Sequence, residues 1–463
     1  MKMKNRILQT LQDLRAYAQT KAAEVALVYH EEDSHLIRFA NSAVSLNTNE
    51  RLIRLEITAF IDHQKASYEL ITNLDQIAEM KQGIDTAVEM ARHAQPLTYR
   101  PTVPEFAESF SDESAYDEAL AVLASGERVA FFNQAVEGLE TDAVRLSGIF
   151  SSGTNILAQI STRSEHTQYF QTSDAQVTVV LSHNGLKWEV IAEQSAQRKA
   201  ELNPAALRAD LGRMVELYST CPPVQLPLGK YDIIFGPAAT ATMIEFMRYI
   251  GVDGGALKRG YSFLSEKDVQ QQVFSPLLTL ADDATRPETF PVRRDLYGRP
   301  RGRCSLVERG VFQGFIYDQD DADEFGAAPT GHSVPHLSLA VDGGTAGVNA
   351  LADLIAMPRE RDLLYIPFLH YTNIVNPSKG LFTGSSRFGA LLLRAGGAVQ
   401  VPYNVRLTQS LLDTLGERVA WISEQTVAYN TSHSYGARNP TAVIVPRFMQ
   451  VNELEISHSN SSY

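Results

Sequence analysis

Four prolines interrupt this chain near its middle, in the stretch CPPVQLPLGKYDIIFGP (residues 221–237). Proline removes a backbone donor and stiffens a connection, so such a stretch is typical of a boundary between domains. The chain has 463 residues, which is longer than one ordinary hydrophobic core supports. We therefore predict two domains, residues 1–222 and residues 229–463.

In the first half, helical and strand patterns occupy separate stretches. Helical spacing of apolar residues marks residues 7–18, 73–94 and 207–217, while residues 24–32 and 51–62 have strand patterns. In RLIRLEITAFID (residues 51–62) the apolar and polar residues alternate, which indicates a sheet with one solvated face. NTNE (residues 47–50) and Asn184-Gly185 have the composition of hairpin turns.

The second half contains mostly short strand patterns divided by glycine and turn residues. We predict turns at residues 282–283, 297–298 and 343–344. This spacing favours a β-rich domain of bent sheet or barrel-like form. Because helices and strands segregate, the predicted fold class is α+β, with an N-terminal antiparallel sheet and packed helices.

The acidic balance of the chain limits its partners. The formal net charge is −13, and Lys and Arg form no stripe of the kind that binds phosphate backbones. FPVRRDLYGRPRGR (residues 290–303) is basic, but it is short and contains Asp295, so it has the character of a solvated hairpin. We expect no direct contact with nucleic acid.

Cysteine usage and the first residues bear on the compartment. Cys221 and Cys304 are far apart and match no zinc spacing, which is typical of free thiols in a reducing compartment. The opening stretch MKMKNRILQTLQDLRAYAQTKAAE lacks the continuous apolar segment of a signal peptide. No apolar run approaches the length of a membrane span. We expect a cytoplasmic protein without a membrane segment.

The residues alone reveal no complete catalytic constellation. The eleven histidines form no HExxH motif, and Pro335 lies inside the only i,i+4 pair, His332 and His336. Neither Ser/Gly-rich stretch, residues 148–155 or 382–390, forms a nucleophile elbow. One carboxylate stands out: Glu245 lies within the apolar helical run ATATMIEFMRYIG.

Several segments, in order, resemble the TldD/TldE (PmbA) family over essentially the whole chain. They are IRFANSAVSLNTNERLIRLEITAFID, LPLGKYDIIFGPAATATMIEFM, LLTLADDATRPETFPVRRDLYGRPRGRCSLVERGVFQGFIYD, and LHYTNIVNPSKGLFTGSSRFGALLLRAGGAVQVPYNVRLTQSLLDTL. The third is the most specific, because it is similar to the family's run of Asp-Asp, Asp-x-x-Gly-x-Pro and Leu-Ile-Glu-x-Gly-Val-Leu.

This resemblance implies where a zinc site would lie. In the catalytic member of the family, TldD, a His-Glu-x-x-x-His helix and a later Cys hold zinc, and a carboxylate takes a proton from water. Those positions fall on Ile244, Glu245, Tyr249 and, approximately, Tyr435 in this chain. We therefore expect no cofactor and no metal at this degenerate site, although His433 lies close to the lost Cys position.

Glu245 allows two interpretations. As a catalytic residue it is a relic of the family's general base. Alternatively, it is an ordinary helix charge paired with Arg248 three residues later. We favour the pairing, because a carboxylate without a metal cannot polarise both water and a scissile carbonyl.

The resemblance implies a TldE-like, non-catalytic subunit that binds extended peptides with a metal-bearing TldD-like partner, or as a homodimer. The alternative is a stand-alone diverged peptidase or peptide-maturation protein with a rebuilt site, for which His332, His336, His370 and His433 are the candidates. A third hypothesis is an indirect effect on DNA topology through degradation of a peptide inhibitor. Whether this chain hydrolyses peptides by itself stays open at this point.

Overall fold

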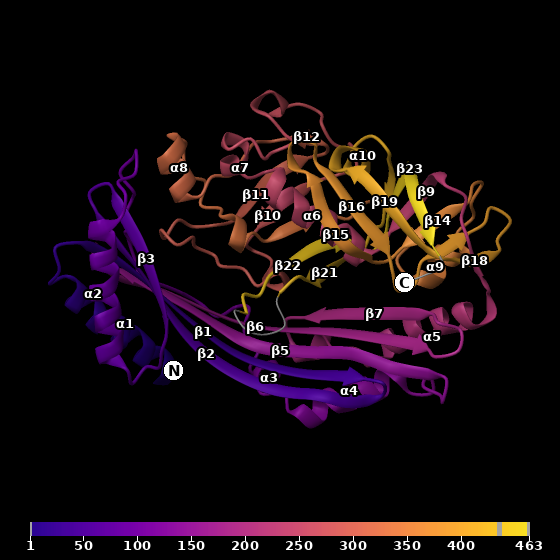
Figure 1. The fold of residues 1–463 in the computed structure, drawn as a ribbon, viewed down its shortest axis with the longest axis horizontal. Helices are drawn as coiled ribbons and strands as arrows, with labels where there is room; N and C mark the ends of the chain where they lie inside the picture. Colours follow the sequence, from indigo (N-terminus) through magenta and orange to yellow (C-terminus); the bar gives the residue numbers. More distant parts are fainter. Residues whose placement is uncertain (1, 433–437, 461–463) are drawn as a thin grey trace.

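The computed structural model describes residues 2–432 and 438–460. Its first half forms one long curved sheet, and its second half lies against the concave side of that sheet (Figure 1). The α+β prediction is confirmed: the N-terminal sheet is antiparallel in all but one short pairing, and the later sheets are mixed and bent. The later sheets have free edges within the described residues, so they do not close into a barrel.

Unusually long strands build the first sheet, which has the order β3-β2-β1-β5-β6-β4 with β7 on β6. The strands are β1 (Glu24–Ala40), β2 (Ala43–Ile61), β3 (Gln64–Ile71), β4 (Phe110–Asp112), β5 (Val144–Ser161), β6 (Ser164–His183) and β7 (Glu189–Ala196). Five helices accompany them in the described part of this half: α1 (Lys2–Ala18), α2 (Ile77–His93), α3 (Glu118–Ala121), α4 (Ser125–Val136) and α5 (Pro204–Thr220).

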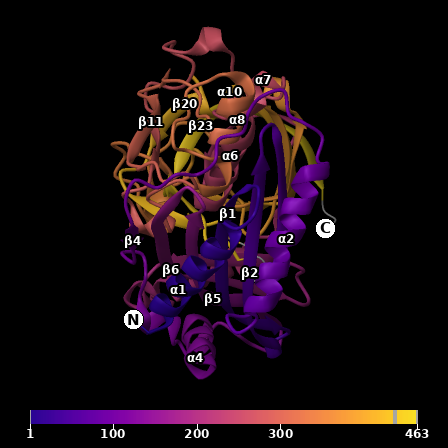
Figure 2. The ribbon, with the colours of Figure 1, turned by 90° about the vertical axis from the view of Figure 1, so that its left-hand side faces the viewer.

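The helices cover two stretches of this sheet. α1 and α2 lie across one end of it, where Leu11 and Ile84 pack with Leu55 and Ile57 of β2 (Figure 2). α4 and α5 pack at the other end. The alternation of apolar and polar residues in β2 therefore matches the structure, because one face of the strand is buried under helices.

Two turn predictions in this half need correction. Residues 47–50 lie inside β2, and the hairpin turn is at Asn41 and Ser42, whose φ angles are 50° and 62°. Asn tolerates this left-handed conformation, whereas the polar 47–50 segment is solvated strand. Asn184-Gly185 does lie in the β6–β7 hairpin, but the loop extends from residue 184 to 188 and is longer than the two-residue turn we predicted.

The second half contains two sheets. The ten-stranded sheet has the order β15-β16-β19-β23-β9-β14-β17-β18-β8, with β20 on β23, and the six-stranded sheet has the order β12-β11-β10-β13-β22-β21. The strands are β8 (Pro223–Val224), β9 (Gly229–Phe235), β10 (Leu280–Asp283), β11 (Arg303–Glu308), β12 (Val311–Phe312), β13 (Leu339–Val341), β14 (Leu363–Ile366), β15 (Leu369–Asn376), β16 (Leu381–Ser386), β17 (Leu391–Leu393), β18 (Val399–Pro402), β19 (Asn404–Ser410), β20 (Val419–Ile422), β21 (Thr426–Asn430), β22 (Ala442–Pro446) and β23 (Met449–Asn460).

Short helices connect these strands, and one longer helix lies among them (Figure 1). They are α6 (Pro237–Ile250), α7 (Gly254–Lys258), α8 (Gln319–Phe325), α9 (Leu351–Ala356) and α10 (Leu411–Leu415). α6 belongs to the largest core, in which Met243, Ile244 and Met247 pack with strand residues from both sheets. No helix in residues 2–432 or 438–460 is long and apolar enough to cross a membrane.

The two halves share part of their core. Phe150 and Val179 of the first sheet belong to the same buried cluster as Tyr365 and Phe448 of the second half. A buried ion pair also joins them: Arg438, just before β22, binds Asp174 of β6 at 2.6 Å. The site residues described below are therefore held in a fixed relation to the first sheet.

Candidate functional site

α6 carries the positions at which the family resemblance places a metal site. Pro237 begins the helix, where a missing N–H costs nothing, and Gly251 follows its last residue. Glu245 Oε2 accepts a hydrogen bond from Arg248 Nη1 at 2.8 Å, and the side chains are 19% and 4% exposed. The helix therefore contains the i,i+3 charge pair that its spacing allows.

The neighbouring positions do not fit a metal. Ile244 is fully buried in the core and carries no ligand atom, while Tyr249 is 50% exposed. Residues 239–260 contain no His or Cys. Tyr435 and His433 lie outside the described residues. Within the described ranges, no group of three or more His, Cys, Asp or Glu side chains could hold a metal ion.

The histidine candidates lie in different places. His332 is buried, with its Nδ1 3.4 Å from Asp282 Oδ2, and burial lowers its pKa. Burial and the nearby Arg301 lower the pKa of His336 to about 4, so it is neutral near neutral pH. His370 packs instead among aromatic rings of β15 and its surroundings. The structure therefore does not assemble these three into one site.

Asp282 and Asp283 form no turn, contrary to the sequence prediction. They end the buried strand β10, and Asp282 accepts hydrogen bonds from Arg301 Nη2 at 2.9 and 3.1 Å and from the Ser338 amide at 2.6 Å. The neutralising arginine lies far along the chain, which no local pattern reveals. The turn predicted at Tyr297-Gly298 is present, with Gly298 at φ 84°.

The arginine-rich segment at residues 290–303 is therefore not a purely solvated hairpin. Arg301 is buried, and every arginine of the segment pairs with a carboxylate. The pairs are Arg293 with Asp112, Arg294 with Glu108, Arg299 with Asp295, Arg301 with Asp282, and Arg303 with Asp283 and Asp342. These carboxylates neutralise the positive charge of the segment.

Both cysteines are free and half-buried. Cys221 donates to the carbonyl of Val399 at 3.5 Å, and burial raises the pKa of Cys304. A raised pKa disfavours the thiolate form of Cys304, the form in which a cysteine reacts.

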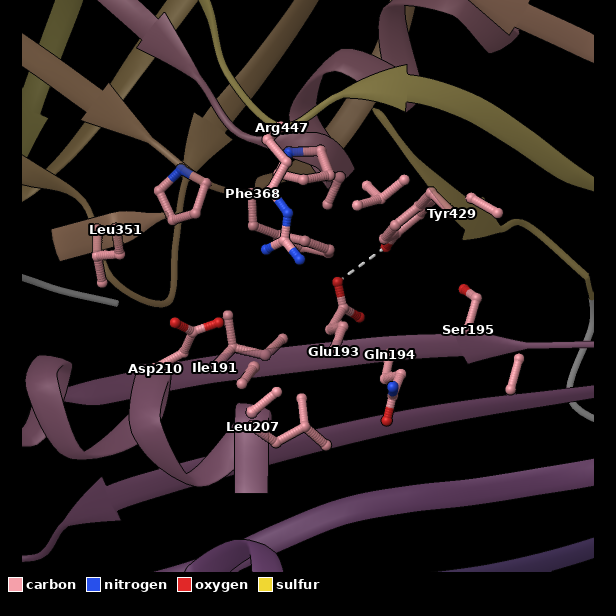
Figure 3. A pocket seen from close by; sticks show the side chains of 18 of the residues that line it. Ile191, Glu193, Gln194, Ser195, Leu207, Asp210, Leu351, Phe368, Tyr429 and Arg447 are labelled. Atoms are coloured by element: carbon pink, nitrogen blue, oxygen red, sulfur yellow. Dashed lines mark hydrogen bonds between the residues drawn. The ribbon is translucent and has the colours of Figure 1, made fainter. Parts of the chain in front are cut away.

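A cavity of about 460 Å³ lies between the two halves of the molecule. Its walls come from β7, α5, the start of α6, β21 and the turn between β22 and β23. Apolar side chains such as Leu207 and Phe368 line much of it (Figure 3). Its volume lies in the range of small-molecule sites, and nothing in the sequence pointed to it.

Five charged residues line this cavity: Glu193, Glu201, Asp210, Glu288 and Arg447. Figure 3 shows the guanidinium of Arg447 directed into the space between the carboxylates of Asp210 and Glu193. Glu193 accepts hydrogen bonds from Tyr429 and Thr178, both at 3.1 Å, yet burial raises its pKa to about 6. Burial also raises the pKa of Asp210, and Arg447 partly opposes this.

Comparison with known proteins identifies relatives of the chain. Residues 228–458 match the family model of the PmbA/TldA metallopeptidase C-terminal domain. A metalloprotease TldD homologue from Haemophilus influenzae is 23% identical over 250 residues, which are 51% of this chain and 50% of the relative. The chain thus spans about half the length of this curated relative.

Solved structures share the fold along nearly the whole chain. TldE from Thermococcus kodakarensis has a TM-score of 0.78 and 16% identity, covering 97% of this chain and 100% of that chain. A protein from Thermotoga maritima, described as a candidate modulator of a DNA gyrase, has a TM-score of 0.76 and 15% identity, covering 97% and 99%. A similarly described protein from Bacteroides thetaiotaomicron has a TM-score of 0.74 and 16% identity, covering 97% and 98%.

The ordered motifs of the sequence, the matched C-terminal domain and the shared fold agree with one another. The chain belongs to the TldD/TldE (PmbA) family.

Proposed function

We propose that this chain is a TldE-type, non-catalytic subunit that works with a metal-bearing TldD-like protein in processing unfolded peptides. As a homodimer it would bind such peptides without cleaving them. The α6 helix carries this proposal. Where the family resemblance places two imidazoles, it has the buried Ile244 and the exposed Tyr249, and its one carboxylate is paired with Arg248. Zinc in a hydrolytic site needs three protein ligands, which these residues do not supply.

The subunit contributes peptide binding in this proposal. An extended peptide gains affinity from main-chain pairing with a free sheet edge, largely independent of its sequence. β15 offers such an edge, because among the described strands it pairs only with β16, and after the buried Leu369 its residues alternate between half-buried and exposed. Tyr371 and Val375 are exposed along it.

Direct DNA binding is not part of the proposal, although two solved relatives are described through DNA gyrase. The arginines of residues 290–303 are paired with carboxylates, and the chain is acidic. Any effect on DNA topology is then indirect, through peptides. We also propose that the protein acts in the cytoplasm. The division into residues 1–222 and 229–463 stays a prediction.

Co-expression with a TldD-like protein of the same organism tests the proposal. We expect the two chains to co-purify and to cleave an unfolded peptide, with cleavage lost when a zinc-ligand histidine of the TldD-like partner is replaced. Failure of the two chains to co-purify, with a stable homodimer of this chain instead, would count heavily against the proposal. Chelator-sensitive cleavage by the isolated chain would overturn the proposal and favour a stand-alone peptidase.

A further inference from the structure

The cavity between β7, α5 and the β22–β23 turn contains a charge arrangement that the proposed function does not use. Of the described residues that line the cavity, only Arg447 is a Lys or Arg, and its Nε is buried with no hydrogen-bond partner in the described part of the chain. Within the described residues, neither Arg447 nor Asp210 takes part in an ion pair. The guanidinium lies near enough to Asp210 to oppose the raised pKa of that carboxyl, but forms no ion pair with it, so a ligand carboxylate can bind the guanidinium more closely.

A simple anion does not satisfy this site. Asp210 lies near Arg447, Glu193 lies on the other side of the guanidinium in Figure 3, and Glu201 and Glu288 also line the cavity, so these carboxylates would repel a second negative charge. A simple cation would in turn meet Arg447. The arrangement matches a ligand that carries an anion and a cation close together.

The rest of the wall indicates the body of that ligand. Leu207, Phe368 and Val427 provide apolar surface. Among the described strands β7 pairs only with β6, so its other edge presents backbone N–H and C=O groups beside the cavity. A ligand that fits this wall has an apolar side chain, a backbone that forms peptide-like hydrogen bonds, and one charge of each sign. An amino acid or a short peptide has all three properties.

We propose that this cavity binds a zwitterionic amino acid or short peptide, with its carboxylate on Arg447 and its ammonium between Glu193 and Asp210. Peptide hydrolysis releases products of this chemical class, amino acids and shorter peptides. The inference concerns the isolated chain and does not depend on a metal-bearing partner.

Calorimetric titration of the isolated chain with the dipeptide Leu-Leu tests this assignment. We expect binding by the wild type, and at least about tenfold weaker binding of acetyl-Leu-Leu and of Leu-Leu-amide, because each loses one charged end. Free leucine and Leu-Leu-Leu, run in parallel, distinguish an amino-acid site from a peptide site. Equal binding of all blocked and free ligands, or no binding of any zwitterion at millimolar concentration, would overturn the proposal.

Variants locate the site. Arg447→Gln and Asp210→Asn should each weaken Leu-Leu binding at least about tenfold, while circular dichroism shows that both fold. Arg213→Gln is the matched control, since Arg213 lies on the same helix as Asp210 but forms an exposed pair with Glu216. Unchanged binding by a folded Arg447→Gln variant would contradict the assignment. This outcome would leave the co-purification test of the proposed function unaffected.

Discussion

Arg438 and Asp174 form a fully buried, two-point ion pair across 264 positions of sequence. Arg438 Nε and Nη2 bind the two carboxylate oxygens of Asp174 at 2.8 and 2.6 Å, and the side chains are 1% and 0% exposed. Asn430 Nδ2 also donates to Asp174, at 3.0 Å. Asp174 therefore holds residues on both sides of the 433–437 segment against the first sheet.

Replacing Asp174 should destabilise the whole molecule. Asp174→Asn removes the carboxylate charge that the buried guanidinium binds at two points, and breaking such a buried pair costs about 3–5 kcal/mol. Urea unfolding followed by circular dichroism measures the effect. Glu216→Gln, which breaks the exposed pair with Arg213, is the control and should change stability by less than about 1 kcal/mol. Equal effects of the two substitutions would contradict a structural role for the buried pair.

Removing the carboxylate of Glu245 should affect stability rather than catalysis. Arg248 is 4% exposed and loses one partner in Glu245→Gln, so the thermal midpoint should fall. Peptide cleavage by the complex with a TldD-like protein should stay within about twofold, whereas loss of a general base costs about 10²–10⁴-fold. Glu89→Gln, in an exposed i,i+3 pair with Arg92, should change neither quantity. A hundredfold loss in a folded complex would make Glu245 catalytic.

The buried carboxylate of Glu193 should give stability a specific pH dependence. Burial raises the pKa of Glu193 from 4.5 to about 6. As the pH falls, the folded chain therefore binds this proton at a higher pH than the unfolded chain does. The cost of ionised Glu193 is fully present above about pH 6 and disappears as the pH falls to about 4.5. Asp210, Arg447 and Tyr429 share its surroundings.

Glu193→Gln should therefore raise the free energy of unfolding by up to about 2 kcal/mol near pH 7.5 and give no gain near pH 4.5. The Gln oxygen can accept from one of the two hydroxyls, Tyr429 or Thr178, and the Gln NH2 can donate to the other, so both contacts can be kept while the charge is removed. Unfolding curves of both proteins at several pH values measure the difference. A difference that does not vary with pH would show that Glu193 has an ordinary pKa.

Chelation should leave the isolated chain unchanged. In the ranges 2–432 and 438–460 no side-chain group suits a metal ion, and a bound metal would stabilise the folded state by mass action. We expect the same thermal midpoint with and without EDTA, and no stoichiometric zinc by elemental analysis. A midpoint that falls with EDTA and recovers with zinc would show that the chain holds a metal.

The sequence predicts the elements that depend on local spacing. The helices α1, α2 and α5 and the alternating strand β2 follow from apolar periodicity. The turns predicted at residues 47–50 and 282–283 are wrong, each for a different reason. The first segment is polar because it is solvated strand, and Asp282 is tolerated in a buried strand because Arg301 neutralises it.

The candidate site residues also differ in whether the sequence can predict their contacts. Glu245 and Arg248 lie three residues apart on one helix, so their pairing is visible in the sequence. Glu193, Asp210 and Arg447 come from a strand, a helix and a distant turn. Only the packing of the second half against the first sheet brings them together, and no local pattern contains that information.

The position of β23 has a consequence for biosynthesis. This strand lies between β9 and β19 and also pairs with β20, so the ten-stranded sheet has a gap at its centre until residues 449–460 have left the ribosome. Until then β9 and β19 present unpaired edges, which invite aggregation. We therefore expect a nascent chain to expose these two edges late in translation, after the strands of the first sheet have been synthesised.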